Sequence, residues 1–461
     1  MSFRYCCVFF FQDEFVKRQL WVGLWSVCIL HRPEWHEMRS FVSKFGLSAV
    51  INAAGTMTNL GAAAANEDAV AAARDILSEF VEMPELQRVA SETISQVCRA
   101  DAGCVTACVA SAISISVAAT MTGDDLAKIE ALPDTHNLKN EVVLQKGHSC
   151  HFSGDISQMV RLSGANPVEI GAVNRTTSYQ LEGALNERSA AGLYVVSHQT
   201  SQTGMLGLKE FAEICHSQNV PVIVDASAEY DLNVFLEQGA DLVLYSAHKF
   251  LGGLRAGIIA GRKDLVRACY LQEYGIGRAM KVGKEGIAST IAVLRRWEKL
   301  DKESLWQAET ARSESAVGRF SGIDGIIAKL EADPTGNPIN RVRLRFDSII
   351  TGIDPQELSR VLASETPAVY VRAHDTDPTS LLLDPCNLTD EDMEYVTKRI
   401  IELLKNSVTS GLKLANVPRS ENVENWPDPP PDTNSHSTKN PVFQSTKSPA
   451  NLVTLKMKRD R

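Results

Sequence analysis

Two stretches of sequence decide the fold: VIVDAS at residues 222–227 and LVLYSAHKFLGG at residues 242–253. Each begins with three or four apolar residues, most of them branched, which is typical of a strand that is buried on both faces of a sheet. Each then ends in polar residues. A helical pattern at 233–238 separates the two stretches, so we expect parallel neighbouring strands whose polar ends meet at one edge of the sheet.

The same alternation continues on both sides of these stretches. Short apolar runs predict strands at 142–145, 193–197, 220–224, 242–245 and 257–260. Helical patterns lie between them at 156–162, 180–187, 208–218 and 233–238, and residues 67–98 read as two helices broken near Pro84. This order predicts an α/β fold with a mostly parallel sheet, whose ligands bind at the carboxyl ends of the strands.

A second pattern follows the sheet. A long helix at 287–309 is expected to lead into a compact α+β unit with strands at 342–346, 368–372 and 381–383 and helices at 355–363 and 390–404. After residue 405 the sequence is rich in Pro, Ser, Thr, Asn and Lys, which predicts disorder. We therefore expect an N-terminal extension (1–44), a large domain (45–310), a small C-terminal α+β domain (311–405) and a disordered tail (406–461).

Composition limits the classes of function. The 461 residues carry a net charge of −9, which argues against broad nucleic-acid binding. The ten cysteines form no CxxC pair and have no zinc spacing, so we expect no metal site and reduced thiols in the cytoplasm.

The apolar runs at 5–11 and 20–30 are shorter than the roughly 20 residues of a membrane span, and no signal cleavage site is clear. We interpret residues 1–44 as an extension, with Met38 as a possible start. The alternative is an arm that packs on a partner subunit. The sequence predicts that residues 1–37 and 407–461 are dispensable for folding.

The polar strand ends carry the chemistry. A carboxylate at Asp225 and an amine at Lys249 suit pyridoxal 5′-phosphate (PLP): the lysine forms a Schiff base with its aldehyde, and the anion keeps its pyridine nitrogen protonated. Ser246 could bond the phosphate. Separately, an Asp and a Lys at strand ends are often structural. The ordered set Asp, Ser-x-His-Lys and Gly-Gly favours the cofactor.

Other candidates surround this set. The small residues at 104–113 run into a helical pattern, so the backbone N–H groups of Ala110 and Ser111 could cradle the phosphate. His148 and His198 lie near predicted strand ends, where an imidazole could stack on the pyridine ring or donate to its phenolic oxygen. Each could equally be a half-buried structural histidine.

Three basic residues are candidates for substrate binding. Arg278 and Lys281 lie in a glycine-bearing loop that could bind a phosphate or carboxylate. Arg372 follows a predicted strand and could clamp a carboxylate with two hydrogen bonds. The alternatives are a solvated loop and a surface ion pair.

At these residues the chain resembles the fold-type I PLP enzymes grouped with bacterial L-seryl-tRNA(Sec) selenium transferase, and more closely their D-glucosaminate-6-phosphate ammonia-lyase branch. The resemblance spans about residues 45–405. Its motifs are INAAGTMTNLG at 51–61, QKGH at 145–148, VVSH at 195–198, DAS at 225–227, SAHK at 246–249, GRAMKV at 277–282, YVRAH at 370–374 and LTDED at 388–392. Two places depart from the family pattern: Ala-Cys-Val at 107–109 replaces Ser-Gly-Ala, and Leu254 replaces proline.

The resemblance implies that Lys249 carries PLP, that Asp225 partners the pyridine nitrogen, and that the chain forms a homo-oligomer, a dimer or larger. It implies a lyase that acts on an amine-bearing small molecule, an amino-sugar acid phosphate or a β-substituted amino acid, by α-proton abstraction and β-elimination. The selenium transferase is the first alternative, but it needs tRNA, and this chain is acidic with a short apolar N-terminal segment. A PLP-binding oligomer without catalytic activity is the second alternative, which the two departures keep open.

Overall fold

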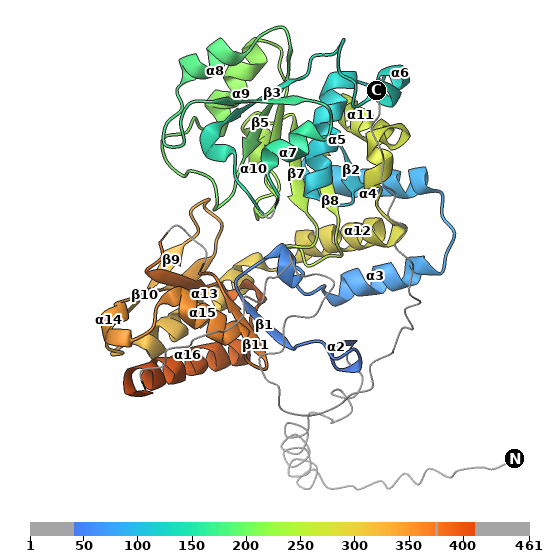
Figure 1. The fold of residues 1–461 in the computed structure, drawn as a ribbon. Helices are drawn as coiled ribbons and strands as arrows, with labels where there is room; N and C mark the ends of the chain where they lie inside the picture. The colour runs from blue at the N-terminus through green and yellow to red at the C-terminus, as the bar shows by residue number, and fades with distance from the viewer. Residues whose placement is uncertain (1–40, 153, 374–376, 411–461) are drawn as a thin grey trace, which may run out of the picture. The chain divides into compact units, whose positions relative to one another are not determined.

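The structure of the chain is a computed structural model that describes residues 41–152, 154–373 and 377–410 (Figure 1). The expectations for residues 1–37, for Met38 as a start and for the tail beyond residue 410 lie outside the described residues. Within the described ranges, no helix is both long and apolar enough to cross a membrane.

A seven-stranded sheet forms the first part of the fold, in the order β2-β8-β7-β6-β5-β3-β4. The strands from β3 to β7 pair in parallel, and β8 pairs antiparallel with both β7 and β2. The predicted α/β class with a mostly parallel sheet is therefore confirmed. The strands are β2 (Ala102–Thr106), β3 (Glu141–Gln145), β4 (Asn166–Ile170), β5 (Ser189–Val195), β6 (Val222–Asp225), β7 (Leu242–Ser246) and β8 (Gly257–Gly261).

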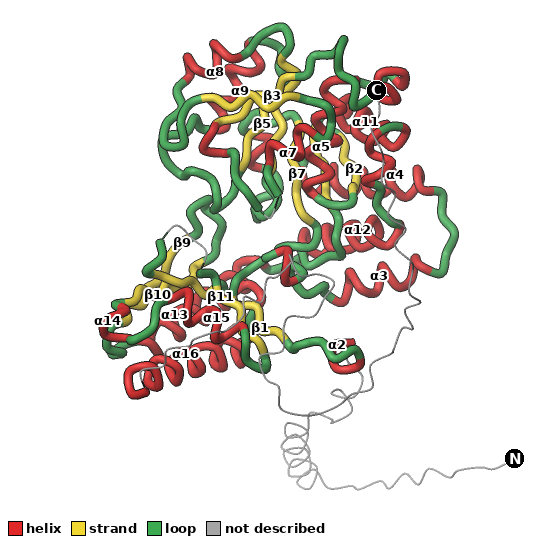
Figure 2. Tube along the Cα trace, viewed as in Figure 1, coloured by secondary structure: helices red, strands yellow, loops and turns green. Residues whose placement is uncertain are grey.

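Helices cover both faces of this sheet (Figure 2). Side chains alternate between the faces along each strand: Val143 of β3 packs in one core cluster, whereas its neighbours Val142 and Leu144 pack in the other. The first cluster also contains residues of α4 (Met83–Cys98), α9 (Leu208–Ser217) and α12 (Lys284–Lys299). The second contains residues of α5 (Val109–Thr122), α7 (Ile156–Arg161) and α11 (Lys263–Leu271). Burial on both faces explains why the strands read as continuous apolar runs.

The C-terminal part has its own sheet and its own hydrophobic core. Three antiparallel strands lie in the order β12-β10-β9, with bounds β9 (Ile326–Ala332), β10 (Asn340–Phe346) and β12 (Ser380–Leu383). A parallel pair, β1 (Val50–Ala53) and β11 (Ala368–Val371), contributes to the same core through Ala53, Val369 and Val371. The prediction of a large domain from residue 45 did not anticipate that β1 pairs with a C-terminal strand. The helices of this part are α13 (Lys302–Phe320), α14 (Ser348–Thr351), α15 (Pro355–Ala363) and α16 (Asp390–Ser410).

Two predicted helix boundaries are wrong. The expected helix at 287–309 is two helices, α12 and α13, because the chain leaves helical geometry at Leu300 and Asp301. The Asp301 side chain accepts a hydrogen bond from the Ser304 N–H and so caps the second helix. At the other end, α16 continues through Ser410, so the predicted boundary at 406 falls inside a helix. Ser407 is buried there, and its hydroxyl donates to the Thr351 carbonyl at 2.6 Å.

The remaining helices connect the strands. The predicted helix pair at 67–98 is present as α3 (Glu67–Leu77) and α4, and Pro84 lies in the first turn of α4, where its missing N–H costs nothing. The others are α2 (Phe41–Lys44), α6 (Leu126–Ala131), α8 (Ser178–Ala184) and α10 (Val234–Glu237), with short 3-10 turns at Lys146–His148 and Ile276–Met280.

Candidate active site

The structure brings Asp225 and Lys249 to the same edge of the large sheet. Asp225 is the last residue of β6 and is 5% exposed. Lys249 follows the end of β7, and the two strands are parallel neighbours in which Asp225 pairs with Leu244. The carboxyl ends of parallel strands meet at one edge, which is where such sheets bind ligands.

Ser227 connects the two candidate catalytic side chains. Lys249 Nζ donates to Ser227 Oγ at 3.1 Å, and the Ser227 N–H donates to Asp225 Oδ1 at 3.0 Å. The carbonyl of Ser227 in turn accepts a hydrogen bond from the Ser246 N–H at 3.2 Å. Ser227 was not among the predicted site residues, although its position two residues after the end of β6 was a usable signal.

Burial shifts both titratable groups toward their neutral forms. Desolvation raises the pKa of Asp225, while the positive charge of Lys249 and hydrogen bonds from Ser227 oppose the rise. Desolvation lowers the pKa of Lys249, while Asp225, Glu229 and Cys150 oppose the fall. A lysine with a lowered pKa spends more of its time as the neutral amine, which is the form that attacks an aldehyde.

The chain after Lys249 makes a fixed turn. The Gly252 N–H donates to the Lys249 carbonyl, and Gly252 has a φ of 67°, a left-handed conformation that favours glycine. Asn66, at the start of α3, donates from its side chain to the Leu251 carbonyl at 3.0 Å. Leu254 stands where the family pattern has proline, and its N–H donates to Ser289 Oγ at 2.9 Å. Proline has no N–H, so this departure adds a hydrogen bond behind the lysine.

The N-terminus of α5 lies beside Ser246. Ser246 pairs with Gly257 of β8, and a Cβ on Gly257 would lie 2.5 Å from the backbone carbonyl of Cys108, which caps α5. The Ser111 hydroxyl accepts from the Cys108 N–H at 3.0 Å and donates to the Cys108 carbonyl at 2.7 Å. Ser111 therefore forms a capping box with Cys108. Of the two predicted phosphate donors, the backbone N–H of Ala110 is the one that remains available for an anion.

Both predicted histidines lie near the end of β5, next to Asp225. His148 is 3% exposed, and its Nδ1 accepts the Val195 N–H at 3.3 Å, where Val195 pairs with Asp225. Burial lowers the pKa of His148 to about 4, so the ring is neutral and its proton is on Nε2. His198 is half-buried and follows Val196, whose N–H donates to the Asp225 carbonyl.

Arg372 is buried in the C-terminal part, so the surface ion pair considered as its alternative is wrong. It is 4% exposed, and it donates to the Ala54 carbonyl through Nε and Nη2 and to Asp384 Oδ2 through Nη2. Asp384 also accepts from Arg341 Nε at 2.7 Å. Two arginines thus share one buried carboxylate, which lowers the pKa of Asp384 to about 2 against the opposing effect of burial.

Arg278 and Lys281 have a different environment. Both are exposed, at the 3-10 turn Ile276–Met280 and just after it. Neither side chain forms a hydrogen bond or ion pair within the described ranges. Burial raises the pKa of the half-buried Glu273, and the charges of Arg278 and Lys281 oppose that rise. The structure does not bring them into contact with Lys249.

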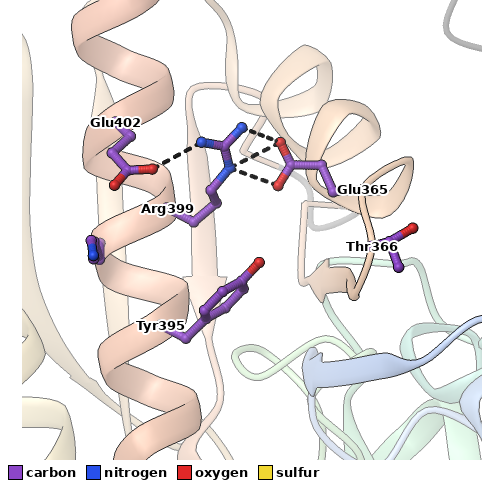
Figure 3. Close-up of a pocket in the computed structure, with 6 residues that line it drawn as sticks. Glu365, Thr366, Tyr395, Arg399 and Glu402 are labelled. Carbon is purple, nitrogen blue, oxygen red and sulfur yellow. Dashed lines mark hydrogen bonds and ion pairs between the residues drawn. The ribbon is translucent and has the colours of Figure 1, made fainter.

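A separate pocket of about 450 Å³ lies in the C-terminal part (Figure 3). Glu365 and Thr366 line it from the connection between α15 and β11, and Tyr395, Lys398, Arg399 and Glu402 line it from α16. Arg399 binds Glu365 through Nε and Nη2 and Glu402 through Nη1. Its guanidinium is therefore already occupied by carboxylates, and we interpret this pocket as the surface of a structural ion-pair cluster.

No group of three or more His, Cys, Asp or Glu side chains within the described ranges is arranged to hold a metal ion. The seven cysteines in these ranges are free thiols.

Comparison with known proteins places this arrangement in a family. Residues 50–308 match the family model SelA, L-seryl-tRNA selenium transferase. The chain is 34% identical to D-glucosaminate-6-phosphate ammonia lyase of Salmonella typhimurium over 364 residues, which cover 79% of this chain and 98% of that protein. It is also 34% identical to 5′-C-glycyluridine monooxygenase-decarboxylase of a Streptomyces species, over 78% of this chain and 90% of that protein.

The fold agrees with the sequence match. The solved structure of D-glucosaminate-6-phosphate ammonia-lyase superposes with a TM-score of 0.72 and 33% identity, covering 80% of this chain and 99% of that one. The resemblance that the motifs indicated is thus confirmed, as is the fold-type I class that it implied. The chain belongs to the L-seryl-tRNA selenium transferase (SelA) family of enzymes.

Proposed function

We propose that the chain is a PLP-dependent lyase that removes a β-leaving group and ammonia from an amine-bearing small molecule. The observation that carries the proposal is the hydrogen-bonded set of Lys249, Ser227 and Asp225 at the carboxyl edge of the sheet, next to the start of α5. A lysine whose pKa is lowered by burial, a buried carboxylate and a helix N-terminus are the three groups that bind the aldehyde, the ring nitrogen and the phosphate of PLP.

The residues divide the work. When bound, PLP supplies an electron sink for the carbon that carries the substrate nitrogen. Lys249 holds the cofactor covalently and, once released, takes the proton from that carbon at its Nζ. Asp225 would hold the pyridine nitrogen, and Ser246 with the Ala110 N–H would hold the phosphate. His148 and His198 are the candidates for contacts with the ring.

The substrate carries at least one anionic group in this proposal. Arg372 is the candidate for its carboxylate, and the exposed side chains of Arg278 and Lys281 are candidates for a phosphate. Arg372 is buried and already paired with Asp384. A substrate carboxylate therefore has to bind guanidinium N–H groups of Arg372 that do not bond to Asp384. An amino-sugar acid phosphate, as in the name of the Salmonella relative, fits this set of cations, and a β-substituted amino acid is the simpler option.

Sequence identity alone does not determine which reaction the chain catalyses, because both relatives named above are 34% identical to it. A tRNA substrate is less favoured because the net charge is −9. We further propose a cytoplasmic homo-oligomer, a dimer or larger, without nucleic acid or membrane as a partner. A PLP-binding oligomer without catalytic activity remains the outcome if no substrate turns over.

The cofactor test is an absorption spectrum of the purified chain with PLP. We expect a visible band that borohydride removes, with the label fixed on Lys249 and absent from Lys249→Ala. Lys263→Ala is the matched control, because Lys263 is an exposed lysine on α11. A wild-type chain that ignores added PLP would contradict the proposal.

The substrate test measures ammonia release from amino acids and phosphorylated amino-sugar acids. Oxygen consumption with a glycyl-nucleoside and transfer to seryl-tRNA are measured in parallel. Ammonia release that requires Lys249 supports the lyase. Activity only in one of the parallel assays replaces it with that reaction.

A further inference from the structure

A third carboxyl group, on Glu229, lies beside the candidate active site and is not used in the proposed reaction. Its N–H donates to the Ala226 carbonyl at 3.1 Å, which closes a turn that also contains Ser227. The Ala226 N–H donates to Leu244 of β7, so this turn is fixed against the strand that leads to Lys249. Glu229 is 3% exposed. Burying an ionisable carboxyl group costs free energy, so a carboxyl in this position near a lysine is a candidate for a functional role.

The Glu229 side chain is held by the turn between β9 and β10 of the C-terminal part. Its Oε2 accepts from Thr335 Oγ1 at 2.9 Å and from Asn337 Nδ2 at 3.0 Å. The Asn337 Oδ1 accepts from the Tyr230 N–H at 2.9 Å. Asn337 therefore binds the backbone of the loop after Asp225 and the side chain within it, so the β9–β10 turn fixes the carboxyl from two directions.

This turn is itself anchored in the buried arginine network. Asp333 Oδ2 accepts from Thr335 Oγ1 and Asn337 Nδ2, while its Oδ1 accepts from Arg341 Nη1 at 3.3 Å. Arg341 also binds Asp384, which is the partner of Arg372. A continuous chain of polar contacts, part-buried at Thr335 and Asn337 and buried at the arginines, thus connects Glu229 to the arginine proposed for the substrate carboxylate.

Three titratable side chains interact electrostatically with Glu229. Asp333 faces it from the β9–β10 turn and raises its pKa, Lys249 faces it from the end of β7 and lowers it, and Tyr245 of β7 is a further titratable neighbour. Desolvation is the largest effect and raises the pKa of Glu229 to about 8. In return, Glu229 opposes the fall in the pKa of Lys249.

We propose that Glu229 is a positioning residue that sets the charge of the group at Lys249, and that Thr335 and Asn337 hold its carboxyl in place for this purpose. The inference rests on the proposed function, because that group is the nitrogen through which the lysine holds PLP. A nearby carboxylate stabilises the protonated, cationic form of a nitrogen and so raises the pH at which the nitrogen loses its proton. The two titrations are coupled, so they are measured as a pair.

The test is a pH titration of the visible absorption of the full-length, PLP-loaded chain. Glu229→Gln keeps the size of the side chain and an oxygen that accepts from Thr335, but it removes the charge. We expect the midpoint of the absorption change to fall by about one pH unit. Thr335→Val removes one donor to the carboxylate, which makes Glu229 harder to ionise, so its midpoint falls by a smaller amount.

Glu309→Gln is the matched control. Glu309 is also a buried carboxyl, whose pKa is raised to about 7 by desolvation, but it lies on α13 and is not among the groups that shift the pKa of Lys249. We expect its midpoint to equal that of the wild type. A purely structural effect of losing a buried carboxyl would instead shift both variants.

The outcomes separate this inference from the proposed function. If the wild type shows no PLP band, the proposed function fails and this inference fails with it. If the band titrates and Glu229→Gln keeps the wild-type midpoint or raises it, the inference alone is overturned. If Glu229→Gln does not fold, Thr335→Val decides, and an unchanged midpoint in that variant overturns the inference.

Discussion

At the scale of single residues, burial and the attraction between Asp225 and Lys249 act in opposite directions on the charges of the site. Asp225 is almost fully buried and Lys249 is half-buried. Ser227 bonds to both: its backbone N–H donates to Asp225, and its hydroxyl accepts from Lys249. Desolvation moves the two pKa values toward each other, and the remaining attraction between the charges limits the movement. A small environmental change, such as a charge gained or lost at the ring of a bound cofactor, can therefore change which group holds the proton.

Asp225→Asn tests the role of the carboxylate at this scale. The variant keeps the size and a hydrogen bond but loses the charge that keeps the ring nitrogen protonated. One charge-assisted hydrogen bond is worth roughly 1.5–3 kcal/mol, so turnover per bound PLP should fall about tenfold to a hundredfold. The borohydride label on Lys249 should persist because the lysine is unchanged. Normal turnover per loaded subunit, with only less folded protein, would make Asp225 a structural residue.

At the scale of elements, the contact between β8 and the start of α5 defines the proposed phosphate site. Gly257→Ala places a methyl group 2.5 Å from the Cys108 carbonyl, so the start of α5 has to move away from Ser246. We expect a loss of PLP affinity of at least tenfold, measured by titrating the apoprotein with PLP, because the phosphate donors move.

Gly183→Ala is the control: it adds a methyl group in α8 with no heavy atom within 4 Å. This control should bind PLP normally and gain a few tenths to one kcal/mol in helix stability. Equal PLP affinity in both variants would show that the start of α5 does not bind the phosphate.

The elements also show what the sequence could and could not predict. β3, β5, β6, β7 and β8 were predicted because burial on both faces requires unbroken apolar runs. β2 is built from AGCVT and β4 contains Asn, Pro and Glu, so neither has such a run. The break between α12 and α13 was missed because apolar and charged residues continue through it, and a single aspartate cap is a weak signal. Asp225, Lys249 and Ser246 were selected as candidates because polar residues stood at the ends of predicted strands, and the structure brings them to one edge of the sheet.

At the scale of the whole molecule, the remaining site residues depend on contacts between distant parts of the chain. Glu229 is held by Thr335 and Asn337, more than a hundred residues later, and Arg372 is held by Ala54, whose position depends on the pairing of β1 with β11. Local sequence patterns do not contain such pairings. The sequence therefore predicted Arg372 only as a substrate-binding residue or a surface ion pair, and it did not predict a role for Glu229. The structure instead shows one buried network of alternating acids and arginines in the C-terminal part, which extends to the loop after Asp225.

Buried carboxyls also make the stability of the whole molecule depend on pH. Glu309 Oε2 is buried without a hydrogen-bond partner among the described residues, and desolvation raises its pKa to about 7 from 4.5. Between these values the folded chain holds a proton that the unfolded chain has released. The free energy of unfolding therefore falls as the pH rises through this window. Glu309→Gln has no proton to lose, so it should be more stable than the wild type by roughly 2–3 kcal/mol at pH 8, and the gain should shrink toward pH 4.5.

Urea unfolding at pH 5 and pH 8 measures this difference directly. Glu314→Gln is the control, because Glu314 is an exposed carboxyl on the same helix and should leave the wild-type difference between the two pH values unchanged. A Glu309→Gln chain that loses as much stability as the wild type from pH 5 to pH 8 would show that Glu309 is ionised, and partnered, in the folded state. In that case the charge of Glu309 would be balanced within the arginine network, with Arg312 as the cation that already opposes the rise in its pKa.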